Sequence, residues 1–235
     1  MKLIYTFLLA TLFLGVASCV GEYNSGKEDP LAQSHKYGSS TSGNSGLEQA
    51  TKDSENPDRN NWQKPRQVIE RLGVLTDKVV ADIGAGSGYF SFQILPNAKK
   101  VIAIDIDPKA LAQIDTLVKS LSSNLQSKLE TRLVGFDDPK LKNEEVDIVF
   151  LSNTYSYIEN KVDYLKTVFK GVKPKGRIYI VDLKMKILPP IFPKAEERVP
   201  LFEVEKHLQE AGFKHVFSDD KTLDYQYIVI AEKEK

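Results

Sequence analysis

An acidic residue followed by three glycines at alternate positions is the part of the sequence with the clearest chemical meaning. The stretch consists of Asp82, Gly84, Ala85, Gly86 and Gly88, directly after an apolar run at 79–81. It predicts a buried strand that turns sharply into a helix. Because glycine has no Cβ, a ligand can approach the backbone of this turn, and N–H groups at the start of the next helix point toward it. The third glycine comes too early for the G-x-G-x-x-G pattern of dinucleotide sites, so the turn leaves no extra room for a diphosphate.

A second acid ends the next apolar run, at residues 101–104. Asp105 lies about twenty residues after Gly84, the separation at which βαβ nucleotide-binding folds place an acid at the tip of the second strand. A carboxylate there can accept hydrogen bonds from both ribose hydroxyls at once. The two acids and the glycines together predict a nucleoside site at the ends of two adjacent strands.

The glycine turn resembles the first motif of the class I S-adenosylmethionine (SAM)-dependent methyltransferases, and the chain is similar to their small methyltransferase-domain family. The resemblance implies SAM as cofactor, with its methionine part beside the turn and its ammonium group at Asp82. It also implies an acid after the third strand that binds the adenine amino group, with an apolar neighbour against the ring. Phe136 matches the neighbour, and Asp137 or Asp138 matches the acid, although either carboxylate could instead form an Asx turn before Pro139. The residues expected to bind SAM are Asp82, Gly84, Ala85, Gly86, Gly88, Asp105, Ile106, Phe136, Asp137, Asp138 and Ser152.

Polar residues after the fourth predicted strand, 146–151, are the candidates for contact with the methyl acceptor, because open parallel sheets bind ligands at the carboxyl ends of their strands. The candidates are Asn153 for positioning, Tyr155 or Tyr157 for contact, and Asp182 at the end of the fifth strand, each with a structural role as its alternative. Similar methyltransferases have paired histidines where this chain has Ser156 and Tyr157, so no histidine base is carried over. A sulfonium methyl is already electrophilic, and the enzyme chiefly aligns the nucleophile and needs a base only for a protonated one.

The elements that position these residues predict an α/β fold. Apolar runs predict strands at 79–83, 101–105, 130–134, 146–151, 177–182, 214–217 and 225–231, and apolar stripes predict helices at 65–72, 89–95, 108–121, 162–169 and 201–211, with a turn at 173–176. The expected architecture is a Rossmann-like three-layer sandwich with a seven-stranded, mostly parallel sheet. Its C-terminal antiparallel hairpin distinguishes class I methyltransferases from dehydrogenases.

Two apolar features beside the predicted site have two interpretations each. Trp62, the only tryptophan, precedes the first helix; it either anchors that helix to the core, which we favour, or forms part of a lid over the ligand. The segment 188–193 is rich in proline and apolar residues, so it cannot be a helix. It either forms a wall of the acceptor pocket or only connects two elements.

The N-terminal residues resemble a bacterial lipoprotein signal peptide, residues 1–18. Lys2 precedes an apolar run of about fourteen residues, and small residues lead to Cys19, the only cysteine. In the lipobox that this resembles, the peptide is cut before the cysteine and the thiol is acylated; an uncleaved anchor or a buried N-terminal helix is the alternative. Residues 19–60 have the composition of a flexible tether, which leaves 61–235 as the methyltransferase domain.

Composition limits the partners. The chain has 32 Lys and Arg against 32 Asp and Glu, so no nucleic acid is expected as a partner, and its three histidines and one cysteine predict no metal site. We expect a monomer attached to the membrane through lipid at Cys19, facing the periplasm, with a small molecule, lipid or protein as methyl acceptor.

Three interpretations of the function follow, because SAM is made in the cytoplasm whereas the leader indicates export. The first, which we prefer, is a lipid-anchored methyltransferase with an unexplained donor supply. The second is a non-catalytic SAM-fold lipoprotein that acts as a ligand-binding or interaction module. The third is a cytoplasmic enzyme whose leader has been misinterpreted.

Overall fold

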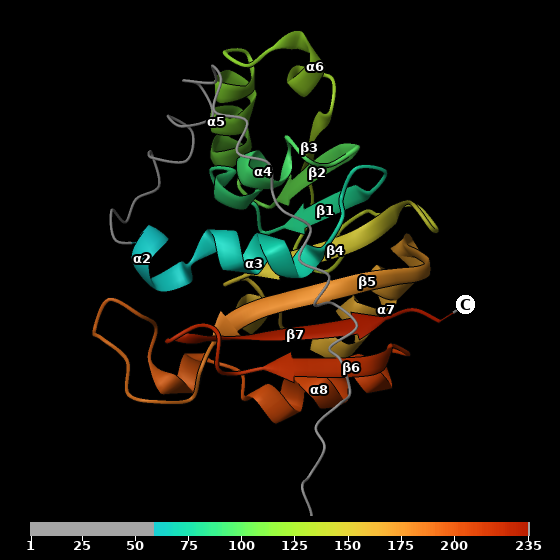
Figure 1. Ribbon diagram of the computed structural model, residues 1–235. Coiled ribbons are helices and arrows are strands. Elements are labelled where there is room, and N and C mark those ends of the chain that lie inside the picture. Colours follow the sequence, from blue (N-terminus) through green and yellow to red (C-terminus); the bar gives the residue numbers. More distant parts are fainter. Residues whose placement is uncertain (1–58, 235) are drawn as a thin grey trace, which may run out of the picture. The chain divides into compact units, whose positions relative to one another are not determined.

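One seven-stranded sheet organises the part of the chain that the computed structural model describes, residues 59–234 (Figure 1). The predicted signal peptide 1–18, Cys19 and the predicted tether as far as residue 58 lie outside the described residues. The strands are β1 (Val79–Ile83), β2 (Lys100–Asp105), β3 (Leu129–Leu133), β4 (Val146–Ser152), β5 (Val172–Leu183), β6 (Lys214–Asp219) and β7 (Gln226–Glu232).

The strand order is β3-β2-β1-β4-β5-β7-β6. The five strands from β3 to β5 are parallel, and β7 lies antiparallel between β5 and β6. This is the predicted mostly parallel sheet with a closing antiparallel hairpin, so the predicted fold class is confirmed. Because the order reverses between β1 and β4, the ends of these two strands border the position where such sheets bind ligands.

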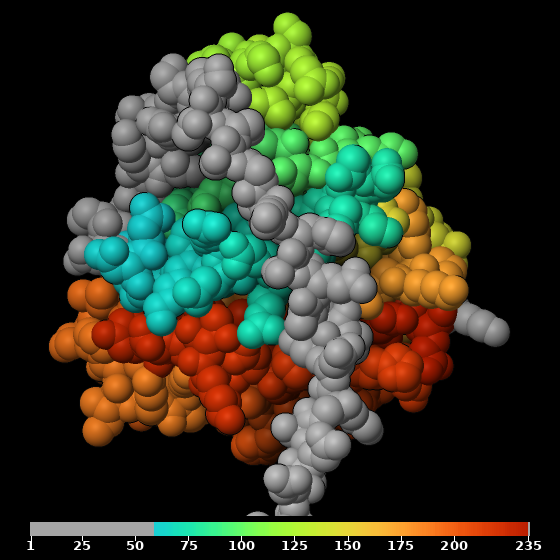
Figure 2. All heavy atoms as spheres, in the orientation of Figure 1, coloured from blue at the N-terminus to red at the C-terminus, as the bar shows by residue number. Residues whose placement is uncertain are grey.

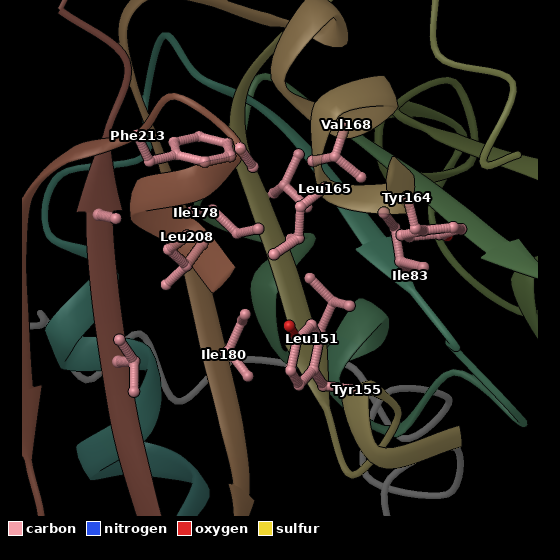
Figure 3. Close-up of a cluster of buried hydrophobic side chains, with 14 of the residues drawn as sticks. Ile83, Leu151, Tyr155, Tyr164, Leu165, Val168, Ile178, Ile180, Leu208 and Phe213 are labelled. Carbon is pink, nitrogen blue, oxygen red and sulfur yellow. The ribbon is translucent and has the colours of Figure 1, made fainter. Parts of the chain in front are cut away.

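Helices cover both faces of the sheet, which explains why the central strands are continuous apolar runs. The helices are α2 (Arg59–Gln63), α3 (Pro65–Leu72), α4 (Tyr89–Ile94), α5 (Pro108–Val118), α6 (Ser123–Gln126), α7 (Lys161–Gly171) and α8 (Leu201–Glu210), with 3₁₀ turns at Tyr155–Tyr157 and Ala195–Glu197. In Figure 1, α3, α4 and α5 lie in front of the sheet and α7 and α8 behind it. Figure 3 shows the buried cluster under α7 and α8, where Leu165, Leu208 and Phe213 pack against the strands.

The structure differs from the sequence predictions in four places. The predicted turn at 173–176 belongs to β5, whose pairing with β4 shifts in register between Val146 and Ile148. A Cβ at Gly176 would lie 2.8 Å from the Asp147 carbonyl oxygen, so the close approach of the two strands requires glycine. The helix that starts at Pro108 ends at Val118 and is followed by the unpredicted α6. A second unpredicted helix, α2, precedes the helix that starts at Pro65. Within residues 59–234, no helix is both long and apolar enough to cross a bilayer.

Candidate cofactor and acceptor site

The glycine turn between β1 and α4 has the open conformation that a ligand needs. Gly84, Gly86 and Gly88 all have positive φ, at 75°, 54° and 88°, a region that favours glycine. A Cβ at Gly84 would lie 2.1 Å from Thr154 Oγ1, whereas a Cβ at Gly86 would meet nothing within 4 Å. Gly84 therefore allows the loops after β1 and β4 to touch, and Gly86 faces free space.

The carboxylate of Asp105 lies directly beside this free space. The Gly86 N–H donates a hydrogen bond of 2.7 Å to Asp105 Oδ2, and the Asp107 N–H donates one of 2.9 Å to Oδ1. Parallel pairing places Ile83 opposite Ile104 and so brings the ends of β1 and β2 together. Each carboxylate oxygen has a second lone pair, so Asp105 can still accept hydrogen bonds from a ribose.

Asp82 is a buried acid at the end of β1, only 2% exposed. Ser91 Oγ on α4 donates a hydrogen bond of 2.6 Å to it. Burial raises the pKa of Asp82 from 3.8 to about 6, against the lowering effects of the Ser91 hydrogen bond and the Arg59 charge. At neutral pH the side chain is a poorly solvated carboxylate, and a cation placed beside it would be bound strongly.

Two exposed apolar side chains follow β2 and β3 at the same edge of the sheet. Ile106 comes directly after Asp105, and Phe136 is 78% exposed. Asp138 Oδ1 accepts a hydrogen bond of 2.7 Å from the Lys140 N–H, which is the Asx turn across Pro139. No group of the described chain donates to the carboxylate of Asp137, and Asp138 Oδ2 can also still accept a hydrogen bond, so both acids remain candidates for an adenine amino group.

Polar residues at the end of β4 and the start of β7 form a second cluster. Ser152 is buried, and its Oγ accepts a hydrogen bond of 2.8 Å from Gln63 Nε2. Asn153 has a positive φ of 54°, and its Oδ1 accepts a hydrogen bond of 2.7 Å from Gln226 Nε2. Gln226 is fully buried, and its Oε1 has no partner among the described residues. Tyr157 is exposed at the same edge.

The surroundings of Tyr155 and Asp182 favour the structural role that the sequence left open as the alternative to acceptor contact. Tyr155 is fully buried in the cluster of Figure 3, and its hydroxyl lies 3.0 Å from His207 Nδ1. It therefore cannot touch an acceptor at the surface. The buried carboxylate of Asp182 accepts hydrogen bonds from the backbone N–H groups of Ser156 (3.0 Å) and Leu183 (2.8 Å), and burial raises its pKa. Asp182 thereby fixes the turn after β4 to the end of β5.

Helix α2 contacts Ser152 and Tyr89, and no pattern in the sequence predicted this helix. Beside the bond from Gln63 to Ser152, Asn60 accepts a hydrogen bond from the Tyr89 hydroxyl, and the Arg59 guanidinium lies 4.1 Å from the centre of the Tyr89 ring. The one sequence feature that drew attention to this region was Trp62, the sole tryptophan. A glutamine or asparagine before a predicted helix carries no signal of its own.

Trp62 and the proline-rich segment meet beside the site. The Trp62 ring packs edge-to-face against Phe192 at 4.9 Å, and Phe192 packs against Tyr225 at 5.3 Å. Trp62 thus contacts the segment after β5, and its buried Nε1 has no hydrogen-bond partner in the described chain. Across residues 59–234, no three His, Cys, Asp or Glu side chains gather as metal ligands.

The middle of the chain is similar to a known protein family. Residues 81–178 match the family described as a methyltransferase domain. A tRNA U34 carboxymethyltransferase from Cellvibrio japonicus is 29% identical over 126 residues, which is 53% of this chain and 38% of that protein. The chain thus spans well under half the length of this curated relative.

Solved structures with this fold include a SAM-dependent methyltransferase from Aquifex aeolicus, with a TM-score of 0.69 and 23% identity over 80% of this chain and 98% of that one. A possible exported protein from Bordetella parapertussis has a TM-score of 0.60 and 19% identity, over 75% of this chain and 68% of that one. These likenesses show that the two proteins share the fold of this chain.

Proposed function

We propose that this chain, which carries a methyltransferase domain, transfers the methyl group of SAM to an acceptor bound beyond the carboxyl ends of β4 and β5. One observation carries the proposal: Gly86 faces free space while its N–H binds the carboxylate of Asp105. An open turn and an acid at its side are what a nucleoside with an amino-acid tail requires. The match of residues 81–178 to a methyltransferase domain supports it.

The roles of the residues follow from their positions. Asp82 binds the ammonium group, Asp105 accepts hydrogen bonds from the ribose, and Phe136 with Asp137 or Asp138 receives the adenine. Bound SAM supplies a methyl group that is already electrophilic. The chain therefore has to hold the acceptor in line and exclude water, an effect worth several kcal/mol.

Calorimetry with SAM and S-adenosylhomocysteine on the full chain tests the cofactor site. Gly86→Val should abolish binding because its side chain would enter the free space. Gly73→Val is the matched control: Gly73 also has positive φ (77°) and nothing within 4 Å of its Cβ position, but it lies at the end of α3. Equal binding by the two variants, or no binding by the unaltered chain, would contradict the proposal.

We also propose that the enzyme is attached to the membrane through lipid at Cys19. The leader sequence supports this, and the shared fold with a possible exported protein is consistent with it. Labelled fatty acid should be incorporated into the chain and not into Cys19→Ser. Unlabelled protein in the cytoplasm would favour the misinterpreted leader instead.

The non-catalytic alternative arises because the leader sequence indicates export, whereas SAM is made in the cytoplasm. Incubation with methyl-labelled SAM and fractionated metabolites, lipids and proteins separates the two functions. A labelled product that the Gly86→Val variant does not form would establish the enzyme. Binding of SAM without any labelled product would establish the ligand-binding module.

A further inference from the structure

Residues 184–194, between β5 and α8, form an exposed basic and apolar segment, here called the contact loop. Its sequence, KMKILPPIFPK, contains three lysines and no acidic residue, in a chain whose charges balance overall. Met185, Ile187 and Ile191 are exposed; Ile187 is fully so and Ile191 is 68% exposed. In Figure 1 the segment projects at the left, at the edge where β5 ends, and Figure 2 shows its orange atoms at the left margin of that face.

The shape of the contact loop is fixed by one arginine. The Arg198 guanidinium donates hydrogen bonds to three carbonyl oxygens, those of Pro193 (2.8 Å), Lys184 (3.1 Å) and Lys186 (2.8 Å). On the inner side, Phe192 packs against the Trp62 and Tyr225 rings. The exposed aliphatic side chains are therefore presented by a backbone that is held on both sides.

This chemistry matches the interface of a lipid bilayer with anionic headgroups. Aliphatic side chains enter the boundary of the acyl chains, and neighbouring lysines bind the headgroup phosphates. Lys186 and Lys194 are the lysines for this role, because the Lys184 ammonium donates hydrogen bonds to the carbonyl oxygens of Asp220 and Leu223. Three of the eleven residues are prolines, which have no backbone N–H, so partial insertion leaves fewer unsatisfied donors. A stable protein interface needs about 800 Å² from each partner, more than a loop with three exposed aliphatic side chains offers.

We propose that the contact loop rests on an anionic lipid surface. The loop leaves the end of β5 and packs through Phe192 on Trp62, so lipid contact would hold the edge with the candidate site next to the bilayer. This proposal depends neither on acylation of Cys19 nor on SAM binding, because it rests only on the loop's exposure, charge and fixed shape.

An environment-sensitive fluorophore on a single cysteine tests the contact. In the full chain with Cys19→Ser, the label is placed at Ile187→Cys or, as the matched control, at Val74→Cys, which is 58% exposed before β1 at the opposite edge of the sheet. Both proteins contain residues 1–58, so any binding through that segment is common to both. With vesicles of phosphatidylcholine and phosphatidylglycerol, emission should shift to the blue at position 187 and stay unchanged at position 74.

A charge-matched pair of variants tests the lysines. Lys186→Gln with Lys194→Gln should weaken the vesicle response by about fivefold per lysine, whereas Lys166→Gln with Lys206→Gln should leave it unchanged. The control lysines pair with acids on their own helices, Asp163 and Glu210. No response at position 187, an equal response at both positions, or an equal response to phosphatidylcholine alone would overturn the proposal and favour a protein partner.

Discussion

Asp82 is the residue at which stability and function should oppose each other. Its pKa rises from 3.8 to about 6 on folding, chiefly through burial, a difference that corresponds to about 3 kcal/mol. The folded state binds the proton more tightly, so the contribution of Asp82 to stability is present below about pH 4 and lost as pH rises through about 6. Asp82→Asn keeps an acceptor for Ser91 and should raise the free energy of unfolding at neutral pH by up to about 3 kcal/mol.

The same substitution should weaken binding of S-adenosylhomocysteine about tenfold or more, because a charged hydrogen bond is worth about 1.5–3 kcal/mol. Denaturant unfolding and calorimetry across this pH range measure both effects. The unaltered protein should lose ligand affinity below about pH 6, and the variant should not. A variant less stable than the unaltered protein at neutral pH, or one that binds equally well, would exclude this role for Asp82.

Helix α2 is held in place mainly by its side-chain contacts with the rest of the domain. It has five residues, too few to be stable alone, and the buried hydrogen bond from Gln63 to Ser152 attaches it to β4. Gln63→Leu should release α2 and expose Trp62. Because Trp62 is the only tryptophan, its fluorescence should shift to the red before the domain unfolds.

Arg66→Gln is the control for α2, since it breaks the exposed Arg66–Glu70 pair on α3, which is worth about 0.3–0.5 kcal/mol. Its tryptophan emission should match that of the unaltered chain. If Gln63→Leu also left the emission unchanged, α2 would be held by other contacts, such as Arg59 on the Tyr89 ring.

The elements that could be predicted from the sequence are those whose pattern lies within their own residues. Buried parallel strands are continuous apolar runs, and the turn at Gly84 and Gly86 required glycine for its own backbone. Asp105 was predictable because its position follows from the end of a strand. The sheet, the open glycine turn and the position of Asp105 beside it therefore followed from the sequence.

The arrangement of the candidate acceptor residues could not be predicted, because it depends on contacts between residues far apart in the sequence. Gln63 and Ser152 are 89 positions apart, and no pattern in either segment indicates the other. Tyr155 and Tyr157 lie in one 3₁₀ turn, yet the first is buried and the second exposed, a difference that periodicity does not reveal. Asp182 looked like a site residue because it ends a strand, whereas its carboxylate binds backbone N–H groups.

At the scale of the whole molecule, the balanced charge predicts weak binding to tRNA, although one relative is named a tRNA U34 carboxymethyltransferase. Equal numbers of acidic and basic residues, 32 each, provide no general attraction for a phosphate backbone, and such attraction supplies nearly all non-specific binding. In fluorescence anisotropy with bulk tRNA and S-adenosylhomocysteine, we expect a Kd weaker than the roughly 10⁻⁴–10⁻⁶ M of typical non-specific binders at physiological salt. We also expect little change at low salt, because few counterions would be released. A micromolar Kd that weakens steeply with salt would instead reveal a local basic surface and make RNA an acceptor to test first.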